Sequence, residues 1–501
     1  MCGIFAMTGT INNEKMDRVL ASMTHRGPDE GSDKKMESFH LGHQRLSIVG
    51  VNHGKQPISN ADESKWIVVN GEIYNYRQLQ RDLPSDTAYL TESDSELALK
   101  WYEKEGASSV RRMDGMFGYV IVDNENETFM AARDTLGIKP LYYGKDQAGN
   151  MVFASEVKTL YVVTDDVNEF PAGHYYTPEE GFVSYRKINL PADEEIYDEK
   201  DVPQMLAGIR RELGEAVEKR LMADVEVGVL LSGGLDSSLI AKIAHEKRKT
   251  SNPMKSFCVG SEGSEDVLRA REVAEEIGTE HYEYIYTEKE LVEALPEVIY
   301  HLESYDSSLV RSAIPSYFVS KLAAEHVKVI LSGEGADELF SGYSYLKEIN
   351  NTKELNEELL RIINTLHNIN LQRADRMSMA HSLELRVPFL DLQLIEYALK
   401  IPSQLKLGED EIEKWILRKA YDGELADNII WRSKAEFSEG SGALDILEKY
   451  AETQYTEEEV AEANKENEWV RSKQELLYYE IFKEHFPHDS ILTTVGHWAT
   501  S

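Results

Sequence analysis

The sequence predicts two joined architectures, an α+β half built on stacked sheets and an α/β half built on a parallel sheet. A chain of 501 residues is too long for a single hydrophobic core, so two domains are expected. Residues 1–190 contain short apolar or alternating segments and few long helical patterns, as strands of stacked sheets require. From residue 204 onward, strand and helix patterns alternate, which favours a parallel sheet with helices on both faces.

The individual elements follow from these patterns. In the first half we expect strands at residues 66–69, 118–122, 129–132 and 151–154. In the second half we expect helices at residues 204–221, 237–247 and 266–278, and strands at residues 225–231, 255–260 and 327–331. Helical patterns dominate the last third of the chain. Residues 191–203 are acidic and poor in apolar side chains, so they are the expected linker between domains 1–190 and 204–501.

Charge and composition limit the partners. The chain has 89 acidic and 54 basic residues, a net charge of −35, so no nucleic-acid partner is expected. Because the chain is strongly negative overall, an anionic substrate must be held by local cations or a metal ion. No apolar run approaches the ~20 residues that span a bilayer, and the N-terminus lacks the basic start of a signal peptide. The two cysteines, Cys2 and Cys258, fit a reducing cytoplasm without disulfides, and the sequence leaves a homodimer open.

Cys2 is the first candidate nucleophile. Removal of Met1 is expected before a small second residue, and it would give Cys2 a free α-amine. The reference pKa of such an amine is about 7.7–8.0, so it can act as the base for its own thiol. The alternative is a cysteine at this position by chance, which Cys2 alone does not exclude.

Polar residues that an acyl transfer needs occur within the next hundred positions. Asn70 offers a side-chain amide and Gly71 a backbone N–H to an oxyanion. Arg45 can hold a carboxylate with two hydrogen bonds, and Glu72 and Asp94 can hold an ammonium group. Taken singly, Arg45 and Asp94 can be structural, and Asn70 with Gly71 can form a hairpin turn. Their joint occurrence with Cys2 favours a catalytic site.

Several strings in this half resemble the glutaminase domain of class II amidotransferases. They are Cys2-Gly-Ile-Phe5, His25-Arg-Gly-Pro-Asp29, Arg45-Leu-Ser-Ile-Val49, Asn70-Gly-Glu-Ile-Tyr-Asn75, Asp114-Gly-Met-Phe117 and Arg133-Asp-Thr-Leu-Gly137. The resemblance implies the N-terminal-nucleophile hydrolase fold, in which two antiparallel sheets lie between helical layers. It also implies that Cys2 is the nucleophile and that Asn70 and Gly71 form the oxyanion hole. The glutamine-binding residues that it implies are Arg45, Leu46, Ser47, Ile48, Val49, Asn70, Gly71, Glu72 and Asp94.

Two loops in the second half suggest a phosphate site. Ser232-Gly-Gly-Leu-Asp-Ser-Ser238 follows a strand and opens a helix, whose N-terminus can bind phosphate. The chain contains no Walker sequence, and a plain strand–helix turn is the simpler alternative. Ser332-Gly-Glu-Gly-Ala-Asp-Glu-Leu-Phe340 follows another strand in the same way. Because ligands bind where parallel strands end, Asp236 and Asp337 are expected to face one phosphate chain through Mg²⁺.

These loops are similar to the synthetase domain of asparagine synthetases, whose first loop is of the ATP-pyrophosphatase type. Further matching strings are Arg376-Met-Ser-Met379, Arg386-Val-Pro-Phe-Leu-Asp391 and Trp431-Arg-Ser-Lys434. The resemblance extends to about residue 440 and more weakly to residue 487. The ATP-binding residues that it implies are Leu231, Ser232, Gly233, Gly234, Asp236, Ser237, Val259, Ser332 and Gly333, with Asp236 and Asp337 as metal ligands.

The resemblance also assigns residues to catalysis and to the second substrate. Glu334 matches the position tied to formation of the β-aspartyl-AMP intermediate, and Lys414 matches the position that stabilises pyrophosphate. Taken alone, Glu334 could cap the helix that follows it, and Lys414 could be an exposed helix lysine. Aspartate-binding residues are expected where the family has a Thr-Thr pair followed by Arg, at Ser307, Ser308 and Arg311. The change from Thr to Ser at both positions keeps the hydroxyl groups but bears on the specificity for the amino-acid substrate.

The function that follows is glutamine-dependent asparagine synthesis in three steps. Cys2 releases ammonia from glutamine through a thioester, and aspartate reacts with Mg-ATP to give β-aspartyl-AMP and pyrophosphate. Ammonia then crosses between the domains and displaces AMP. One alternative is a related synthetase that forms a β-lactam or macrolactam, and another is a catalytically silent nitrogen-sensing or binding protein. The presence of Cys2, Asp236, Glu334, Asp337 and Lys414 favours the asparagine-forming enzyme.

Overall fold

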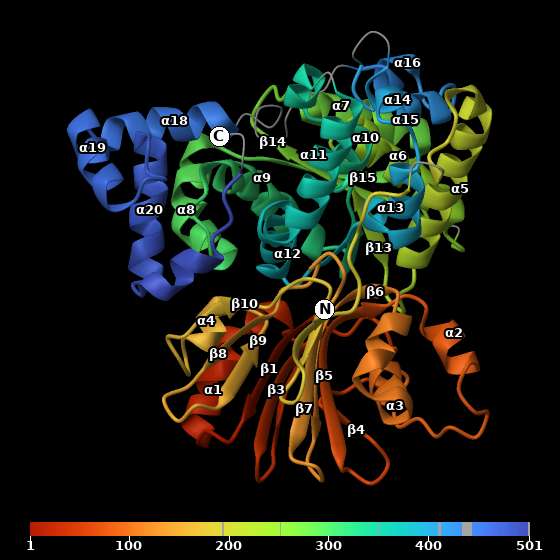
Figure 1. Ribbon diagram of the computed structural model, residues 1–501. Helices are drawn as coiled ribbons and strands as arrows, with labels where there is room; N and C mark the ends of the chain where they lie inside the picture. Colours follow the sequence, from red (N-terminus) through yellow and green to blue (C-terminus); the bar gives the residue numbers. More distant parts are fainter. Residues whose placement is uncertain (193–194, 251, 350, 409–411, 433–442, 499–501) are drawn as a thin grey trace.

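The computed structural model describes residues 1–192, 195–250, 252–349, 351–408, 412–432 and 443–498. Two bodies lie against each other, the N-terminal half in red to yellow and the C-terminal half in green to blue (Figure 1). Met1 lies between the two bodies and is 2% exposed. Among the helices of the described residues, none is both long enough and apolar enough to cross a bilayer.

The N-terminal half contains two stacked six-stranded antiparallel sheets, as predicted. The first sheet has the order β10 (Asn168–Glu169), β8 (Tyr142–Lys145), β9 (Met151–Ala154), β1 (Cys2–Thr8), β3 (Phe39–Arg45) and β2 (Glu30–Lys35). The second has the order β12 (Gly181–Ser184), β11 (His174–Thr177), β7 (Thr128–Arg133), β6 (Gly115–Asp123), β5 (Lys65–Ile73) and β4 (Ile58–Ser59). Helices α1 (Asn13–Ser22) and α4 (Val157–Leu160) cover the first sheet, and α3 (Glu96–Glu105) covers the second, beside α2 (Tyr76–Arg81).

The alternation of side chains along β5 explains why its apolar run is continuous. Val68 packs into the core between the sheets, together with Val120 of the paired strand β6. Its neighbours Ile67 and Val69 point to the other face, where they pack with Trp101 of α3. Because successive strand residues face opposite sides, a strand covered on both faces is apolar at every position.

The C-terminal half is built on a five-stranded parallel sheet, again as predicted. Its order is β15 (Glu280–Ile285), β14 (Lys255–Gly260), β13 (Val227–Leu230), β16 (Val329–Leu331) and β17 (Glu384–Arg386). Helices α6 (Leu235–Lys247), α7 (Glu265–Ile277) and α9 (Ser307–Ala324) pack on these strands. Helix α5 (Val202–Arg220) begins inside the expected linker, because Pro203 fits the first turn of a helix.

Helices fill the rest of this half and confirm the helical C-terminal part. The described ones are α8 (Glu288–Leu302), α10 (Ala336–Phe340), α11 (Thr352–Thr365), α12 (Asn370–Met379), α13 (Leu392–Leu399), α14 (Gln404–Leu407), α15 (Trp415–Ala420), α16 (Asp427–Ile430), α18 (Ala443–Gln454), α19 (Glu457–Glu466) and α20 (Lys473–His485). Ser433 and Lys434 of the predicted Trp431 string lie outside the described residues.

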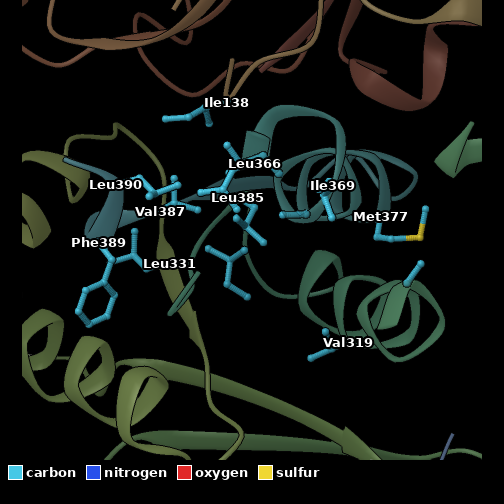
Figure 2. Packing of buried hydrophobic residues seen from close by; sticks show 14 of the residues in the cluster. Ile138, Val319, Leu331, Leu366, Ile369, Met377, Leu385, Val387, Phe389 and Leu390 are labelled. Carbon is cyan, nitrogen blue, oxygen red and sulfur yellow. The ribbon is translucent and has the colours of Figure 1, made fainter. Parts of the chain in front are cut away.

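One buried apolar cluster joins the two halves. Ile138, from the N-terminal half, belongs to the same cluster as Leu366, Leu385 and Val387 of the C-terminal half. Figure 2 shows Ile138 facing Leu366 and Leu385, with Met377 of α12 alongside. The two halves therefore pack against each other through a shared apolar core.

Candidate active sites

Cys2 occupies the start of the central strand of the first sheet. It pairs with Arg45 across β1 and β3 and is only 6% exposed. The Cys2 N–H donates to Asn70 Oδ1 at 3.1 Å. Within the described residues, the buried Asn70 Nδ2 has no hydrogen-bond partner. A buried unpaired donor is costly unless a ligand accepts from it, so Asn70 fits an oxyanion hole beside Cys2.

Gly71 is held in a conformation that only glycine adopts easily. Its φ is +143°, and a Cβ at this position would lie 1.9 Å from the Met116 carbonyl oxygen. Asn70 and Gly71 lie in the interior of β5, paired with Gly118 and Phe117 of β6. The hairpin-turn alternative is therefore wrong.

The Met1 ammonium group is buried at the contact between the two halves. Its nitrogen lies 2.8 Å from Glu384 Oε2, and both side chains are fully buried. Burial alone would lower the pKa of this amine, but Glu384 and Cys2 raise it above its ordinary value. Burial raises the pKa of the Cys2 thiol. While Met1 is attached, the Cys2 nitrogen is an amide and cannot act as a base, so the predicted mechanism requires removal of Met1.

Two buried carboxylates, Glu72 and Asp94, interact electrostatically with the amine of Met1, the residue before Cys2. Burial raises the pKa of Asp94 to about 6, and burial together with Asp94 raises the pKa of Glu72 well above its ordinary value. Arg386, from the C-terminal half, approaches Glu72 Oε1 to 3.7 Å. Within the described residues Glu72 Oε2 has no hydrogen-bond partner. Such a pair favours a bound ammonium group, because a cation would stabilise both ionised carboxylates.

The predicted glutamine-binding loop lies beside Cys2 and against the C-terminal half. The Arg45 guanidinium donates to the carbonyls of Gly50 at 2.8 Å and Val51 at 3.1 Å. Leu46 and Ile48 are buried in a cluster that includes Met1, Val329 and Met379. Arg45 thus supports the loop, and its expected contact with a substrate carboxylate stays a prediction, as do the contacts of Ser47 and Val49.

The first phosphate loop links β13 to α6. Gly234 is the N-cap of α6 and receives no side-chain cap, which leaves this helix end to a ligand. The Ser237 hydroxyl accepts from the Ser232 N–H at 3.2 Å and donates to the Gly234 carbonyl at 3.2 Å. Gly233 has φ +72°, and a Cβ there would lie 2.5 Å from Arg269 Cβ. These contacts fix the backbone conformation of the loop.

The two phosphate loops share a cavity of about 230 Å³. Phe257, Cys258 and Arg418 are among the residues that line it. Cys258 is 2% exposed, which agrees with a small core residue, although it also lines the cavity. Of the residues predicted for the second site, Gly233 does not line the cavity. Those that do line it are Leu231, Ser232, Gly234, Asp236, Ser237, Val259, Ser332, Gly333, Glu334, Asp337 and Lys414.

Lys414 lies between the two predicted metal ligands. Its Nζ is 2.5 Å from Asp236 Oδ2 and 2.7 Å from Asp337 Oδ1. Burial alone would lower the pKa of Lys414, but the two aspartates raise it above its ordinary value. Lys414 is 3% exposed and has φ +58°, an uncommon conformation for a residue with a side chain. The exposed-helix-lysine alternative is therefore wrong.

Glu334 forms an ion pair with Arg373 of α12 inside the cavity. Helix α10 begins two residues later, with Gly335 as its N-cap and no side-chain cap bond. The helix-cap alternative for Glu334 is therefore not supported. Sequence patterns did not single out Arg373 or Arg418, and both line the cavity. Arg432 was another unassigned cation, and it also lines the cavity.

The predicted aspartate-binding residues lie apart from this cavity. Ser307 and Arg311, at the start of α9, line a separate cavity of about 740 Å³ beside α18 and α20. Ser307 donates to Glu475 Oε1 at 3.3 Å, and Arg311 donates to Ser308 Oγ at 3.2 Å. The cavity shared by the two loops is lined instead by Ser316, Val319 and Ser320 of α9. The structure does not bring the two sets together, and the aspartate assignment stays a prediction.

Comparison with known proteins covers both halves. The glutamine amidotransferase domain family matches residues 1–189, and the asparagine synthase family matches residues 208–353 and 347–495. A probable glutamine-hydrolysing asparagine synthetase from Dictyostelium discoideum is 37% identical over 534 residues, covering 99% of this chain and 96% of the relative. The glutamine-hydrolysing asparagine synthetase of Zea mays is 38% identical over 525 residues, covering 100% of this chain and 89% of the relative. A solved glutamine phosphoribosylpyrophosphate amidotransferase from B. subtilis superposes with a TM-score of 0.33 at 15% identity, over 57% of this chain and 91% of that chain.

Proposed function

The chain belongs to the family of glutamine-hydrolysing asparagine synthetases, and we propose that its two sites divide the reaction between them. The enzyme is a carbon–nitrogen ligase that converts aspartate, glutamine, ATP and water to asparagine, glutamate, AMP and pyrophosphate. The observation that supports two separate half-reactions is that one chain contains both sites. One site is the buried Cys2–Asn70 pair, and the other is the cavity in which Lys414 lies between two aspartates. The lactam-forming and silent-protein alternatives are not favoured, since identity to asparagine synthetases extends over the whole chain.

The first site hydrolyses glutamine after removal of Met1. The free Cys2 amine takes the thiol proton, and the thiolate attacks the side-chain carbonyl carbon of glutamine. The oxyanion accepts hydrogen bonds from Asn70 Nδ2 and the Gly71 N–H. The carbon–nitrogen bond breaks, the amine returns its proton and ammonia leaves. Water then hydrolyses the thioester to glutamate, while Glu72 and Asp94 hold the substrate ammonium group.

The second site activates aspartate. A β-carboxylate oxygen of aspartate attacks the α-phosphorus of ATP, and pyrophosphate leaves with the electron pair of the broken bond. Lys414 and the first turn of α6 stabilise the charge on pyrophosphate. Glu334 and Arg373, paired at the cavity wall, orient the second substrate. Ammonia then attacks the acyl carbon, and AMP is the leaving group.

Asp236 and Asp337 fit a bound Mg²⁺. Carboxylate oxygens together with phosphate oxygens are the ligands that Mg²⁺ prefers, and the ion would neutralise charge on the triphosphate. Both carboxylates already converge on one cation, the Lys414 ammonium group. Asp236→Asn and Asp337→Asn should each abolish pyrophosphate release with either nitrogen donor while glutaminase activity persists. Normal release with an unchanged Mg²⁺ requirement in both variants would contradict this metal site.

Ammonia is proposed to cross the shared apolar core rather than bulk water. The cluster in Figure 2 contains Ile138 from the glutaminase half and Leu385 from the synthetase half. Apolar surroundings favour neutral ammonia over ammonium, because a buried unpaired charge is costly. The ammonia that reaches the acyl carbon therefore remains a nucleophile.

The proposal is tested by measuring asparagine and pyrophosphate together with aspartate and ATP, using either glutamine or ammonium chloride. Equal amounts of asparagine and pyrophosphate with both donors are expected. Pyrophosphate release with another carboxylate, but not with aspartate, would favour the lactam-forming alternative. Absence of pyrophosphate under every condition would favour a binding protein.

The domain boundaries, oligomeric state and location belong to the same proposal. We assign residues 1–190 to the glutaminase domain, 191–203 to the linker and 204–501 to the synthetase domain. The family matches over residues 1–189 and from residue 208 to residue 495 support this division. The partners are small-molecule substrates, and a cytoplasmic enzyme without nucleic-acid or membrane partners is consistent with the acidic composition and two cysteines. A homodimer is compatible with these features and is tested by light scattering.

A further inference from the structure

The loop after β3 is joined to the C-terminal half at Asp224, which lies between α5 and β13. Residues 46–54 form this loop and include most of the predicted glutamine-binding segment. The Gly50 N–H donates to Asp224 Oδ2 at 2.8 Å, and the Asp224 N–H donates to the Ile48 carbonyl oxygen at 2.9 Å. Because one residue bonds the loop backbone at two points, it fixes both the position and the direction of the chain there.

Gly50 connects Asp224 to Arg45, the residue expected to hold the carboxylate of glutamine. While its N–H is bonded to Asp224, its carbonyl oxygen accepts from Arg45 Nη2 at 2.8 Å. The same guanidinium donates to the carbonyls of Val49 at 3.5 Å and Val51 at 3.1 Å. A planar guanidinium bonded to neighbouring carbonyls takes its orientation from them, so the position of Gly50 sets that of Arg45.

Other bonds hold the loop on either side of this point. The Ser47 N–H donates to Asp29 Oδ2 at 2.8 Å, and Lys328 of the C-terminal half reaches the same oxygen at 2.7 Å. The His53 N–H donates to the Gly50 carbonyl at 3.0 Å and closes the turn. These bonds anchor the loop within and beside the N-terminal half, and they leave the Gly50 N–H to Asp224.

The contact at Asp224 borders a cavity of about 730 Å³ between the two halves. Val49 and Asp224 line this cavity, together with Tyr74 and Arg77 of the N-terminal half. Asp224 is exposed, and Arg77 attracts it electrostatically. Because the loop faces open space on this side, hydrogen bonds rather than close packing hold its backbone around Gly50 in place.

We propose that Asp224 is a positioning residue for glutamine: it holds Gly50 so that Arg45 is placed to bind the substrate carboxylate. The inference rests on the proposed function, since it assumes that Cys2 hydrolyses glutamine. Arginine has five N–H groups, so its three bonds to the loop leave two for a carboxylate. Without the Asp224 side chain, the loop takes up positions in which Arg45 is displaced. The fraction of molecules able to bind glutamine then falls, and KM rises by the same factor.

The test compares Asp224→Ala with the parent in steady-state glutamine hydrolysis by the full chain. KM for glutamine should rise about tenfold, which is the effect of losing one charge-assisted hydrogen bond. The value of kcat should stay within about twofold, because glutamine, once bound, meets the same thiol. Asp224→Asn should restore most of the affinity, since its amide oxygen can still accept from the Gly50 N–H. Ammonia-dependent synthesis should stay within about twofold of the parent in both variants, because it does not use Cys2.

Labelling of Cys2 gives a second readout that does not depend on turnover. A glutamine analogue with a diazoketone in place of its side-chain amide needs Arg45. At subsaturating concentration it should therefore label Asp224→Ala about tenfold more slowly than the parent. Iodoacetamide has no carboxylate, so its rate of reaction with Cys2 should not fall. The mass of the N-terminal peptide identifies Cys2 and separates it from Cys258. Slower labelling by both reagents would mean a damaged thiol site and would overturn a role in carboxylate binding.

Glu226→Ala is the matched control. Glu226 lies two positions from Asp224, lines the same cavity and pairs with Lys255 at 2.8 Å, so its loss should leave KM for glutamine unchanged. If Asp224→Ala fails to fold, Asp224→Ser repeats the test with a side chain one atom shorter than aspartate.

An unchanged KM for glutamine in Asp224→Ala would overturn the proposal. Equal losses of glutamine- and ammonia-dependent synthesis, together with a lower melting temperature, would show that Asp224 is merely structural. Failure of the parent to hydrolyse glutamine would instead contradict the proposed function.

Discussion

Lys414 and Asp236 form a partly buried ion pair, with Lys414 Nζ 2.5 Å from Asp236 Oδ2, at the point where the two phosphate loops meet. The loops themselves touch, since a Cβ on Gly333 would lie 2.8 Å from Asp236 Cβ. Lys414 comes from a third segment and also reaches Asp337. A single cation therefore stabilises two carboxylates in the free enzyme. In the proposed site, Asp236 and Asp337 would hold a Mg²⁺ ion bound with the triphosphate, and Lys414 would then be available to the phosphate oxygens.

Lys414→Met should abolish adenylation while leaving glutamine hydrolysis intact. The variant loses a buried cation aimed at pyrophosphate, and loss of one such preorganised group costs about 2.7–4 kcal/mol, or about a hundred- to a thousandfold in kcat. Pyrophosphate release with either nitrogen donor measures the effect. Lys419→Met is the control, because Lys419 lies on the next turn, is exposed and pairs with Asp422. Near-normal pyrophosphate release in Lys414→Met would show that the lysine is structural.

Cys2→Ala should remove glutamine-dependent synthesis and leave ammonia-dependent synthesis within about twofold of the parent. The reason is that the thiolate takes part only in the first half-reaction. Asparagine formation is measured with glutamine and with ammonium chloride in parallel. Because Cys2 is small and lies at the start of β1, the variant should fold normally, and its melting temperature checks this. Loss of both activities in a folded variant would contradict the assignment of separate sites.

The KM for glutamine should rise as the pH falls through about 6. The pKa of Asp94 in the free enzyme is about 6 rather than 3.8, because the carboxyl is buried. In the proposed site the ammonium group of glutamine binds the ionised form of Asp94, so the apparent KM should increase about tenfold at pH 5 relative to pH 7. Because its pKa is higher in the folded protein than in the unfolded chain, protonated Asp94 stabilises the fold below about pH 3.8. This stabilisation is lost as the pH rises through about 6.

Asp94→Asn isolates this group in the glutaminase assay. The variant should have a high KM that changes little between pH 5 and pH 7, whereas the parent's KM changes steeply. The melting temperatures at pH 5 and pH 7 should differ less for Asp94→Asn than for the parent. Parallel KM profiles for the parent and the variant would mean that another group controls glutamine binding.

The sequence predicted elements whose patterns are local and missed contacts that depend on the packing of distant segments. The apolar run of β5 and the glycine-rich turn after β13 have explanations within a few residues, and both were placed correctly. Arg26 and Asp375 are 349 positions apart, and neither has a pattern that indicates a partner in the other half. The orientation of Lys414 could not be predicted either, because its partners Asp236 and Asp337 lie in segments far from it in the sequence.

Glu334→Gln should lower kcat for asparagine formation with either donor more than it raises the KM for ATP. The carboxylate pairs with Arg373 at the cavity wall, while the loop around it already offers Ser332 and Gly333 to the nucleotide. Glutamine at this position keeps the shape but removes the charge that holds Arg373, so the loss should appear when the acyl-adenylate forms or is attacked. A loss of about 2.7–4 kcal/mol is expected, and Glu334→Asp should be intermediate. Steady-state kinetics with a melting curve decide the matter: a destabilised variant with near-normal kcat would mean that the Glu334–Arg373 pair serves only stability.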